Sequence, residues 1–525
     1  MTTTHYVTLA SALLYYILFY PVVNYLSRRK ALKDLATKHD CKDPVREYPW
    51  EVLGIMKVYD TALHIMRGTS LENISRLFAQ YGDTYATRIL NQRVYITCDP
   101  RNIRHILVNR FSDFSSSRPR AHLFAPVAGN GIFTVDGAEW KAARRLYTRV
   151  FSNVQRVLDL ESHEAAFQAL RRHIPAGHVV DLQPLFFNLI TDLNTTFATG
   201  ISTDSLSPHQ PPDKKQLFES LNYVKRVITR DALMGPVRHL LSHKGYARAC
   251  KTLKVFVEGV IRDEIASRSV ARQDEAQAQP GEDTHAHTHR QSVVQCILDA
   301  ESDVVTIQDA VVSILIAGTD SVAGLLSSTF YLLARHERVY AKLRREVLDT
   351  VGAQPPRYEM LRKITYLGYV FNEAMRLLPS VPLNARTATR DTWLPVGGGD
   401  HRHGRESAVL VRNGEIVIFS PWESHRSTKA FGHDSFEFRP ERWDGLKTES
   451  LGYVPFGDGP RVCIGQRYAI LQASYVAIRM IQTFSSLHNT DARPWTEMFE
   501  FNLFNKNGVV VELMPDTQVA ADYSE

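Results

Sequence analysis

The hydrophobic pattern of the chain begins with a long apolar run, from Val7 to Leu26, that contains no charged residue. Such a run is long enough to cross a bilayer as a helix. Arg28, Arg29 and Lys30 follow it at once, and basic residues on that side favour a cytoplasmic body. A cleaved signal peptide is the alternative, but the segment before the run carries no Lys or Arg and the run is too long. We therefore predict one N-terminal transmembrane helix.

A second, almost uncharged run extends from Asp309 to Arg335. Its length would also allow a membrane span. However, Asp320 and several Ser and Thr residues stand in its middle, where lipid would leave them without partners. We therefore expect a buried central helix of a large domain.

Polar and apolar positions alternate in two shorter regions. Thr84–Leu90 and Arg93–Cys98 are separated by two residues and predict a β-hairpin. Phe499–Met514 alternates around an Asn-Gly pair and predicts another hairpin. Helical patterns dominate from Asn102 to Arg376. The predicted fold class is mainly α with a small β region.

Composition adds limits to this picture. The 525 residues are 44% apolar, which is ample material for a large core, and no low-complexity linker divides the middle of the chain. We expect an anchor at 1–30, a connector at 31–50 and one large domain at 51–525. The net charge of +6 is spread over the chain, so no polybasic arm indicates a nucleic-acid partner.

Cysteine usage excludes a disulfide scaffold, and the histidines cluster in one polar stretch. The cysteines stand far apart and do not form a disulfide framework, which fits a reducing compartment; they are Cys41, Cys98, Cys250, Cys296 and Cys463. The stretch Arg272–Gln291 contains three alternating histidines, His285, His287 and His289. Because the stretch is so polar, we interpret it as a solvated loop between helices. The histidines could bind a metal, and in such a loop we expect that binding to be adventitious.

Cys463 differs from the other cysteines because it lies in a glycine-rich loop just before an apolar, helix-like run, Gln466–Phe484. At the N-terminus of a helix, backbone amides and the helix dipole favour a thiolate. A thiolate can ligate haem iron. The alternative is a lone structural cysteine among glycines.

The spacing Phe-x-x-Gly-x-Arg-x-Cys-x-Gly, from Phe456 to Gly465, resembles the haem-binding signature of the cytochrome P-450 superfamily. Arg461 could pair with a haem propionate, and Gly459 and Gly465 allow tight turns. The resemblance covers Tyr48 to Met514 and implies haem b, held noncovalently except for the axial bond to Cys463.

Two further segments agree with this family. Glu373 and Arg376 lie one turn apart on a predicted helix and can pair, although such pairs are more often found on surfaces. The segment Phe438–Trp443 resembles the one that supplies a second arginine, here Arg442, to that glutamate. The resemblance implies a structural cluster that holds the loop around Cys463.

In the middle of the second apolar run, Ala317-Gly318-Thr319-Asp320-Ser321 is similar to the family's oxygen-activation motif. We take Gly318, Thr319, Asp320 and Ser321 as the catalytic candidates. Gly318 would let the helix kink so that O₂ can bind, and Asp320 with the neighbouring hydroxyl would relay protons. Ser321 departs from the usual threonine, because it keeps the hydroxyl but loses the methyl that restricts its rotamer.

Three further cationic or aromatic positions match haem-propionate contacts of the family. Trp140 and Arg144 lie at i and i+4 on one helix face, where a surface Trp/Arg stack is the alternative. Arg386 matches another propionate contact. The same helix carries a basic stripe, which we interpret as a docking site for an acidic reductase or as a solvated face; its members are Lys141, Arg145 and Arg149.

The resemblance implies a monooxygenase that inserts one oxygen atom from O₂ into a C–H bond. Electrons would come from NADPH through NADPH–cytochrome P-450 reductase, with cytochrome b5 as a further partner. The enzyme would sit in the endoplasmic reticulum membrane, in contact with membrane lipid, with its catalytic domain in the cytosol. Two alternatives are a P-450-like isomerase or dehydratase that needs no external electrons, and a haem sensor.

The substrate is expected to be hydrophobic. Leu377–Asp391 and Gly452–Phe456 look most like the fungal branch known for alkane and fatty-acid hydroxylation. Relatives of that branch also act on polyketide or lipid-like chains in fungal secondary metabolism, which is the alternative. The resemblance implies four apolar substrate-facing segments, Phe114–Pro126, Ile314–Val322, Ser380–Leu383 and Phe501–Phe504.

Overall fold

Alternating strands and amphipathic helices organise the chain into two units in a computed structural model. The structure describes residues 20–516, apart from 51–52, 91, 236–237, 239–242, 278–290, 400–405 and 449–450. Each unit is assembled from segments that are far apart in the sequence. Unit 1 combines 1–60, 74–115 and 385–419, and unit 2 combines 61–73, 116–384 and 420–525.

Unit 1 is built on a five-stranded sheet with the order β1-β2-β8-β5-β3. β1 and β2 pair antiparallel with Thr84 opposite Thr97, so the predicted hairpin is confirmed. The alternation buries one face against a small core of Leu77, Phe78, Tyr85, Val94 and Ile96. The strands of this sheet are β1 Thr84–Ile89, β2 Gln92–Thr97, β3 Phe114–Ser115, β5 Asn384–Ala388 and β8 Ile416–Phe419.

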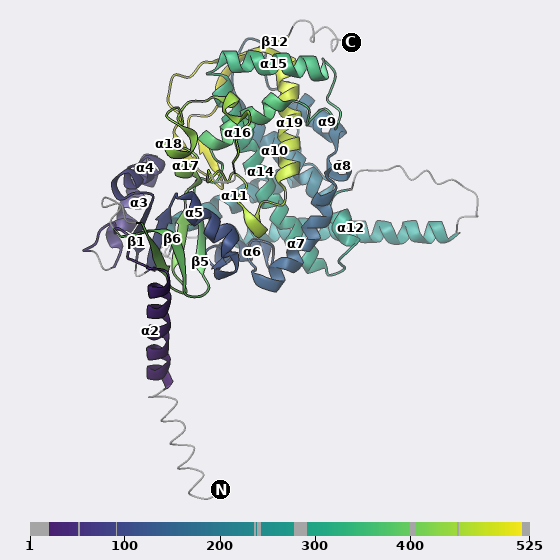
Figure 1. The fold of residues 1–525 in the computed structure, drawn as a ribbon. Helices are drawn as coiled ribbons and strands as arrows, with labels where there is room; N and C mark the ends of the chain where they lie inside the picture. Colours follow the sequence, from purple (N-terminus) through teal and green to yellow (C-terminus); the bar gives the residue numbers. More distant parts are fainter. Residues whose placement is uncertain are drawn as a thin grey trace, which may run out of the picture. The chain divides into compact units, whose positions relative to one another are not determined.

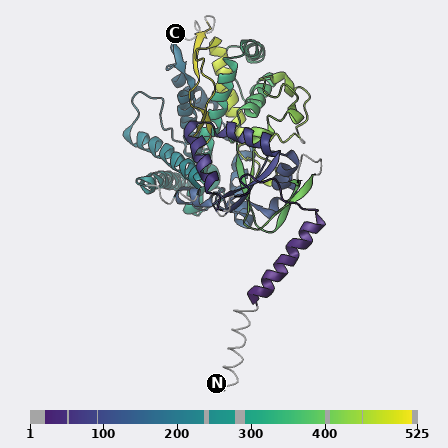
Figure 2. The ribbon, with the colours of Figure 1, turned by 90° about the vertical axis from the view of Figure 1, so that its left-hand side faces the viewer.

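The other helices and strands that have residues in unit 1 include a strand pair and four α-helices. They are β6 Thr392–Gly398, β7 Ser407–Val411, α2 Tyr20–Lys38, α3 Ile55–Arg67, α4 Ser70–Tyr81 and α5 Pro100–Arg104. α2 is a single straight helix in both ribbon views (Figures 1 and 2). It contains the end of the apolar run Val7–Leu26, but residues 1–19 lie outside the described part of the chain. The predicted N-terminal span therefore stays a prediction.

Unit 2 is mainly helical. Its helices are α6 Ala121–Ala128, α7 Gly137–Ser152, α8 Val154–Val157, α9 Leu160–Arg171, α10 Leu182–Thr199, α11 Pro212–Met234, α12 Tyr246–Gln277, α13 Val293–Leu298, α14 Val304–Leu333, α15 Glu337–Val351, α16 Thr365–Leu377, α17 Pro421–Ser424, α18 Thr428–Phe431 and α19 Gln466–Thr483. Its strands form a sheet of order β4-β12-β9 and a β10–β11 pair. They are β4 Val179–Asp181, β9 Phe484–Asn489, β10 Glu497–Phe499, β11 Leu503–Asn505 and β12 Val510–Pro515.

α14 is the central helix of this unit and packs against α10, α16 and α19 (Figure 1). It starts where the Asp303 carboxylate accepts a hydrogen bond from the Thr306 amide at 3.0 Å. A helix that is apolar on all sides needs neighbours on all sides. Among the described helices, Val304–Leu333 alone is long and apolar enough to cross a membrane, but 83% of its most apolar window is buried inside the protein. The prediction of a buried central helix is confirmed.

Two sequence-based predictions about local structure were wrong. The segment around Asn507-Gly508 does not form a hairpin, because β11 pairs with β10 while β12 pairs with β4 and β9. The turn at Gly508, with φ +74°, sends the chain into a different sheet. α12 continues to Gln277 and so includes the start of the predicted loop Arg272–Gln291. The three alternating histidines lie outside the described residues.

Candidate functional site

The loop before α19 presents Cys463 at the start of that helix. The Cys463 amide donates to the Phe456 carbonyl at 2.9 Å, which closes the loop. Gly459, with φ +66°, makes the turn between them. The thiol accepts hydrogen bonds from the amides of Gly465 and Gln466. Cys463 is exposed, whereas the other four cysteines are buried or half-buried and all five are free thiols.

The pKa of the Cys463 thiol is set by opposing effects. The helix N-terminus was expected to favour a thiolate. Partial desolvation raises the pKa of the thiol, while the Gly465 and Gln466 amides and Arg144 lower it. The helix end therefore favours the thiolate, and a coordinated metal ion would favour it further.

Trp140 and two arginines form a stack beside this loop. Trp140, on α7, is buried. The guanidinium of Arg461 lies 4.5 Å from its ring centroid, and that of Arg144 lies 5.6 Å away. Arg144 Nη1 also donates to the Val462 carbonyl at 3.1 Å, so α7 is joined directly to the cysteine loop. Trp140 and Arg144, the pair predicted on α7, therefore form one stack with Arg461 of the cysteine loop.

The charge of this cluster fits a dianionic ligand. Arg461 forms an ion pair with Asp136, and Arg120 and Arg144 also act on it electrostatically. Burial, together with these two cations, lowers the pKa of Arg461 to about 10 despite Asp136. Among the groups that act on Arg461, cations outnumber carboxylates, and this excess of positive charge suits the two propionates of a haem.

Arg461 also carries an unused hydrogen-bond donor. Its Nε is buried, and among the described residues it has no acceptor. A buried N–H without a partner is rare in proteins and indicates a missing group. The residues present therefore fit haem. Arg120 and Asp136 were missed by the sequence analysis, and only the pairing of distant segments reveals them.

Glu373, Arg376 and Arg442 form one buried cluster. Arg376 donates to both oxygens of Glu373 at 2.8 Å, and Arg442 Nε lies 3.3 Å from Glu373 Oε1. Trp443 Nε1 adds a hydrogen bond at 2.9 Å. Glu373 and Arg376 are fully buried, so their charges are compensated by protein partners, which also include the Arg439 amide and the His425 carbonyl. The cluster joins α16 to the segment Pro440–Trp443.

Asp320, on α14, forms a buried ion pair that the sequence analysis missed. Lys225 Nζ, on α11, donates to Asp320 Oδ1 at 2.5 Å. Burial raises the pKa of Asp320, and Lys225 acts in the opposite direction. Lys225 Nζ also lies 4.5 Å from the Phe187 ring centroid. The candidate proton donor is therefore held by a helix that is remote in sequence.

Gly318 and Thr319 both contact Asn194 of α10, and their predicted catalytic roles stay predictions. α14 is assigned as one α-helix through Gly318, and this residue faces Asn194 of α10. A Cβ at Gly318 would lie 2.1 Å from Asn194 Oδ1. Asn194 Nδ2 donates to the Thr319 hydroxyl at 3.2 Å, and Thr319 is fully buried. Both residues thus serve the contact of α10 with α14, because a glycine is needed where Asn194 reaches the α14 backbone.

Ser321 is half-buried, and its hydroxyl donates to the Ala317 carbonyl at 3.2 Å. Ser380 approaches from the segment after α16, with its Oγ 3.5 Å from the Ser321 carbonyl. Arg386 belongs to unit 1, where it is buried, donates to the Ala385 carbonyl at 2.8 Å and lies over the Phe419 ring. Its predicted contact with a propionate stays a prediction.

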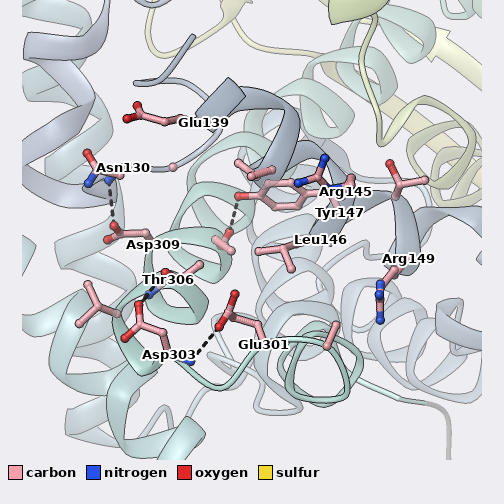
Figure 3. A pocket seen from close by; sticks show the side chains of 17 residues that line it. Asn130, Glu139, Arg145, Leu146, Tyr147, Arg149, Glu301, Asp303, Thr306 and Asp309 are labelled. Carbon is pink, nitrogen blue, oxygen red and sulfur yellow. Dashed lines mark hydrogen bonds between the residues drawn. The ribbon is translucent and has the colours of Figure 1, made fainter. Parts of the chain in front are cut away.

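A cavity of about 690 Å³ opens on another side of α7 (Figure 3). Arg145 and Arg149 of the predicted basic stripe line one wall, and Asp303 and Asp309 line another. The lining residues do not include Cys463, Trp140 or Arg144. The stripe residues Lys141, Arg145 and Arg149 are all exposed, which a docking surface requires.

A cysteine loop beside a Trp/Arg stack and a long buried helix is the arrangement expected of a haem-thiolate protein, and the comparisons agree with this class. The chain matches the cytochrome P450 family over residues 44–510. It is 36% identical to cytochrome P450 monooxygenase himC of Aspergillus japonicus, over 92% of this chain and 86% of that protein. It is 33% identical to cytochrome P450 52A13 of Debaryomyces hansenii, over 82% and 83%. It is also 33% identical to cytochrome P450 monooxygenase FPY7 of Fusarium mangiferae, over 93% and 92%. The chain belongs to the cytochrome P450 family and is a monooxygenase.

Proposed function

We propose that this enzyme hydroxylates an unactivated carbon of a hydrophobic substrate with a long aliphatic chain. Electrons would come from NADPH through a reductase. The observation that carries the proposal is the position of Cys463 beside Trp140, Arg144 and Arg461, with an excess of positive charge and an unused buried donor. Haem bound there supplies O₂ activation and electron transfer.

Each group of residues has a separate task in this proposal. Cys463 would ligate the haem iron, and Arg144, Arg461 and Trp140 would hold the propionates. Asp320 delivers protons after its contact with Lys225 loosens, and the Ser321 hydroxyl positions the water that carries them. The buried α14 excludes bulk water from the reacting carbon.

A second candidate function is oxidation in a fungal secondary-metabolite pathway, on a polyketide or lipid-like chain that also bears polar groups. Charged groups next to Asp320 favour this second function, because a plain hydrocarbon offers such groups neither a hydrogen bond nor an opposite charge. Glu500 and Arg226 interact electrostatically at that place. A non-redox isomerase would not need a proton donor such as Asp320.

For location, we propose attachment to the endoplasmic reticulum membrane through the apolar run Val7–Leu26, with the catalytic body in the cytosol. The exposed stripe of Lys141, Arg145 and Arg149 would bind the acidic face of the reductase, with cytochrome b5 as a second electron donor.

The test combines spectroscopy with product analysis. The reduced enzyme with carbon monoxide is expected to show the red-shifted Soret band of thiolate ligation, and Cys463→Ala is expected to lose both the band and activity. Reconstitution with reductase and NADPH is then followed by mass spectrometry of products from fatty acids, alkanes and polyketide chains. Hydroxylated fatty acids support the first candidate, and turnover of polyketide chains alone supports the second. A Cys463→Ala variant that keeps the band contradicts the whole assignment.

A further inference from the structure

The cavity beside α7 lies between that helix and the start of α14 (Figure 3). Its volume of about 690 Å³ is within the range of pockets that hold small organic molecules. The described residues that line it all belong to unit 2, and they come from 130–131, α7 and 300–310. They do not include Cys463, Trp140 or Arg144. The cavity is therefore separate from the proposed haem site.

Exposure distinguishes the rim of the cavity from its floor. The rim carries exposed charged side chains, and these are Glu139, Arg145, Arg149 and Asp303. The floor is formed by buried residues, which are Gly131, Tyr147, Asp309 and Ala310. Half-buried Glu301 adds a further carboxylate to the lining. The two signs of charge balance at the rim, whereas Asp309 is the only charged group on the floor among the described residues. A ligand group that reaches the floor therefore meets a carboxylate.

The Asp309 carboxylate has its charge only partly compensated. Its Oδ2 accepts the Asn130 amide at 2.8 Å, and within the part of the chain that the structure describes it forms no ion pair. Gly129, at φ +47°, leaves room for the carboxylate where a Cβ would collide with it. Burial raises the pKa of Asp309, and the Asn130 amide and Lys254 offset this only in part. A buried carboxylate in that state is stabilised by a cation that enters the cavity.

Apolar side chains form much of the cavity wall. They lie on α7 and on α14, and they are Ala142, Ala143, Leu146, Val305 and Ala310. A further polar group on the floor, the Tyr147 hydroxyl, is already engaged, because it donates to the Ala310 carbonyl at 3.0 Å. The cavity therefore offers van der Waals contact to a hydrocarbon body and one buried anionic partner to a polar end.

We propose that this cavity is a second ligand site, which binds a small organic ammonium ion with an apolar body. The ammonium group pairs with Asp309 at the floor, and the body lies against Ala142 and Leu146 of α7. A carboxylate ligand would place like charges together at the floor, and a neutral molecule of the same shape would leave Asp309 without a counter-ion. Binding at this site does not depend on the proposed reaction, because the cavity and the haem-site residues do not overlap.

The test measures, by titration calorimetry, the binding of two ligands with the same body, cyclohexylmethylammonium and cyclohexylmethanol. The holoenzyme is reduced and held under carbon monoxide, so that the amine nitrogen cannot ligate the haem iron. Wild type is expected to bind the ammonium ion at least about tenfold more tightly than the alcohol, since only the ion can neutralise Asp309. Equal affinities, or tighter binding of the alcohol, overturn the inference.

Asp309→Asn removes the charge and keeps an oxygen that can accept the Asn130 amide. It is expected to weaken ammonium binding at least about tenfold and to leave alcohol binding within about threefold of wild type. Asp349→Asn, at an exposed position of α15, is the matched control and keeps the wild-type ratio of the two Kd values. A wild-type ratio in Asp309→Asn contradicts the inference.

Ala142→Trp is the second variant and tests the cavity without a buried substitution. Ala142 is exposed on α7 and lines the cavity, so the indole fills space that the ligand needs. Ammonium binding is expected to fall at least about tenfold, and unchanged binding places the ligand elsewhere and overturns the inference. The carbon monoxide band is recorded on the same samples. Absence of the thiolate band from wild type contradicts the proposed function, whereas a normal band with a failed ammonium test contradicts only the second site.

Discussion

Lys225 and Asp320 form an ion pair inside unit 2, with Nζ and Oδ1 2.5 Å apart and each side chain only 3% exposed. The pair joins α11 to α14 at the residue proposed to deliver protons. Two charges so deeply buried are each costly to leave alone. The geometry of α11 and the protonation of Asp320 are therefore coupled.

Breaking this pair from one side is expected to cost stability. Lys225→Met leaves the Asp320 carboxylate without its partner, so the free energy of unfolding should fall by about 3–5 kcal/mol. The double variant Lys225→Met with Asp320→Asn removes both charges and should lose less than the sum of the two single variants. Urea unfolding of all four proteins gives the coupling energy. Strictly additive losses would show that the two side chains do not stabilise one another.

Ser321→Thr is expected to improve the coupling of NADPH consumption to product formation. The added methyl restricts the rotamer of a hydroxyl that now bonds only to the Ala317 carbonyl among the described residues. Ser321→Ala should have the opposite effect and release more hydrogen peroxide for each NADPH consumed. Peroxide and product are measured in the same reconstituted reaction. If peroxide release is the same in all three proteins, Ser321 has no part in proton delivery.

Gly318→Ala is expected to destabilise the protein by about 1–3 kcal/mol, because the new methyl displaces Asn194 from its hydrogen bonds to α14. Gly368→Ala is the matched control, since this helical glycine is exposed and has open space where a Cβ would stand. The control should be neutral or stabilising by up to about 1 kcal/mol. Thermal unfolding compares the two. If Gly318→Ala destabilises an Asn194→Ala background as much as it destabilises wild type, the new methyl group clashes with something other than Asn194.

His425 is expected to make the fold sensitive to acid. It is fully buried, its Nε2 accepts the Val454 amide at 2.9 Å, and burial lowers its pKa to about 3. The unfolded chain takes up a proton below about pH 6.5, whereas the folded chain does not. Stability should therefore be unaffected above that pH and fall by up to about 1.4 kcal/mol for each pH unit on acidification toward pH 3.

His425→Gln should be less stable at neutral pH but show a smaller decrease between about pH 6 and pH 4, since it has no proton to gain. His433→Gln, at an exposed position, should keep the wild-type slope. Urea unfolding at a series of pH values measures both. An identical slope in His425→Gln would assign the acid sensitivity to other groups.

Charge reversal on the basic stripe is expected to weaken reductase binding alone. Lys141→Glu with Arg145→Glu should raise the apparent KM for reductase and reduce the salt dependence of electron transfer, with substrate Kd unchanged. Lys215→Glu with Lys251→Glu makes the same charge change at exposed positions of α11 and α12. A reductase titration that does not distinguish the two double variants would remove the stripe as a docking site.

Local sequence determined much of the candidate site. The fixed spacing around Cys463 sets a turn at Gly459 and a helix start at Gln466, because backbone geometry acts over a few residues. Glu373 and Arg376 meet because residues three apart share a helix face. The buried nature of α14 followed from its composition, since polar residues in the middle of an apolar helix need protein partners.

Tertiary structure decided the partners of those residues. Lys225 and Asp320 are 95 residues apart, and Asn194 and Thr319 are 125 apart, so no local pattern marks either pair. The pKa of the Cys463 thiol is lowered partly by Arg144, which only the packing of α7 brings to the cysteine loop. The strand after Gly508 pairs with β4 and β9 because sheet partners are chosen by the packing of the whole unit. Periodicity and capping act along the chain, whereas ion pairs, desolvation and strand partners depend on which elements pack together.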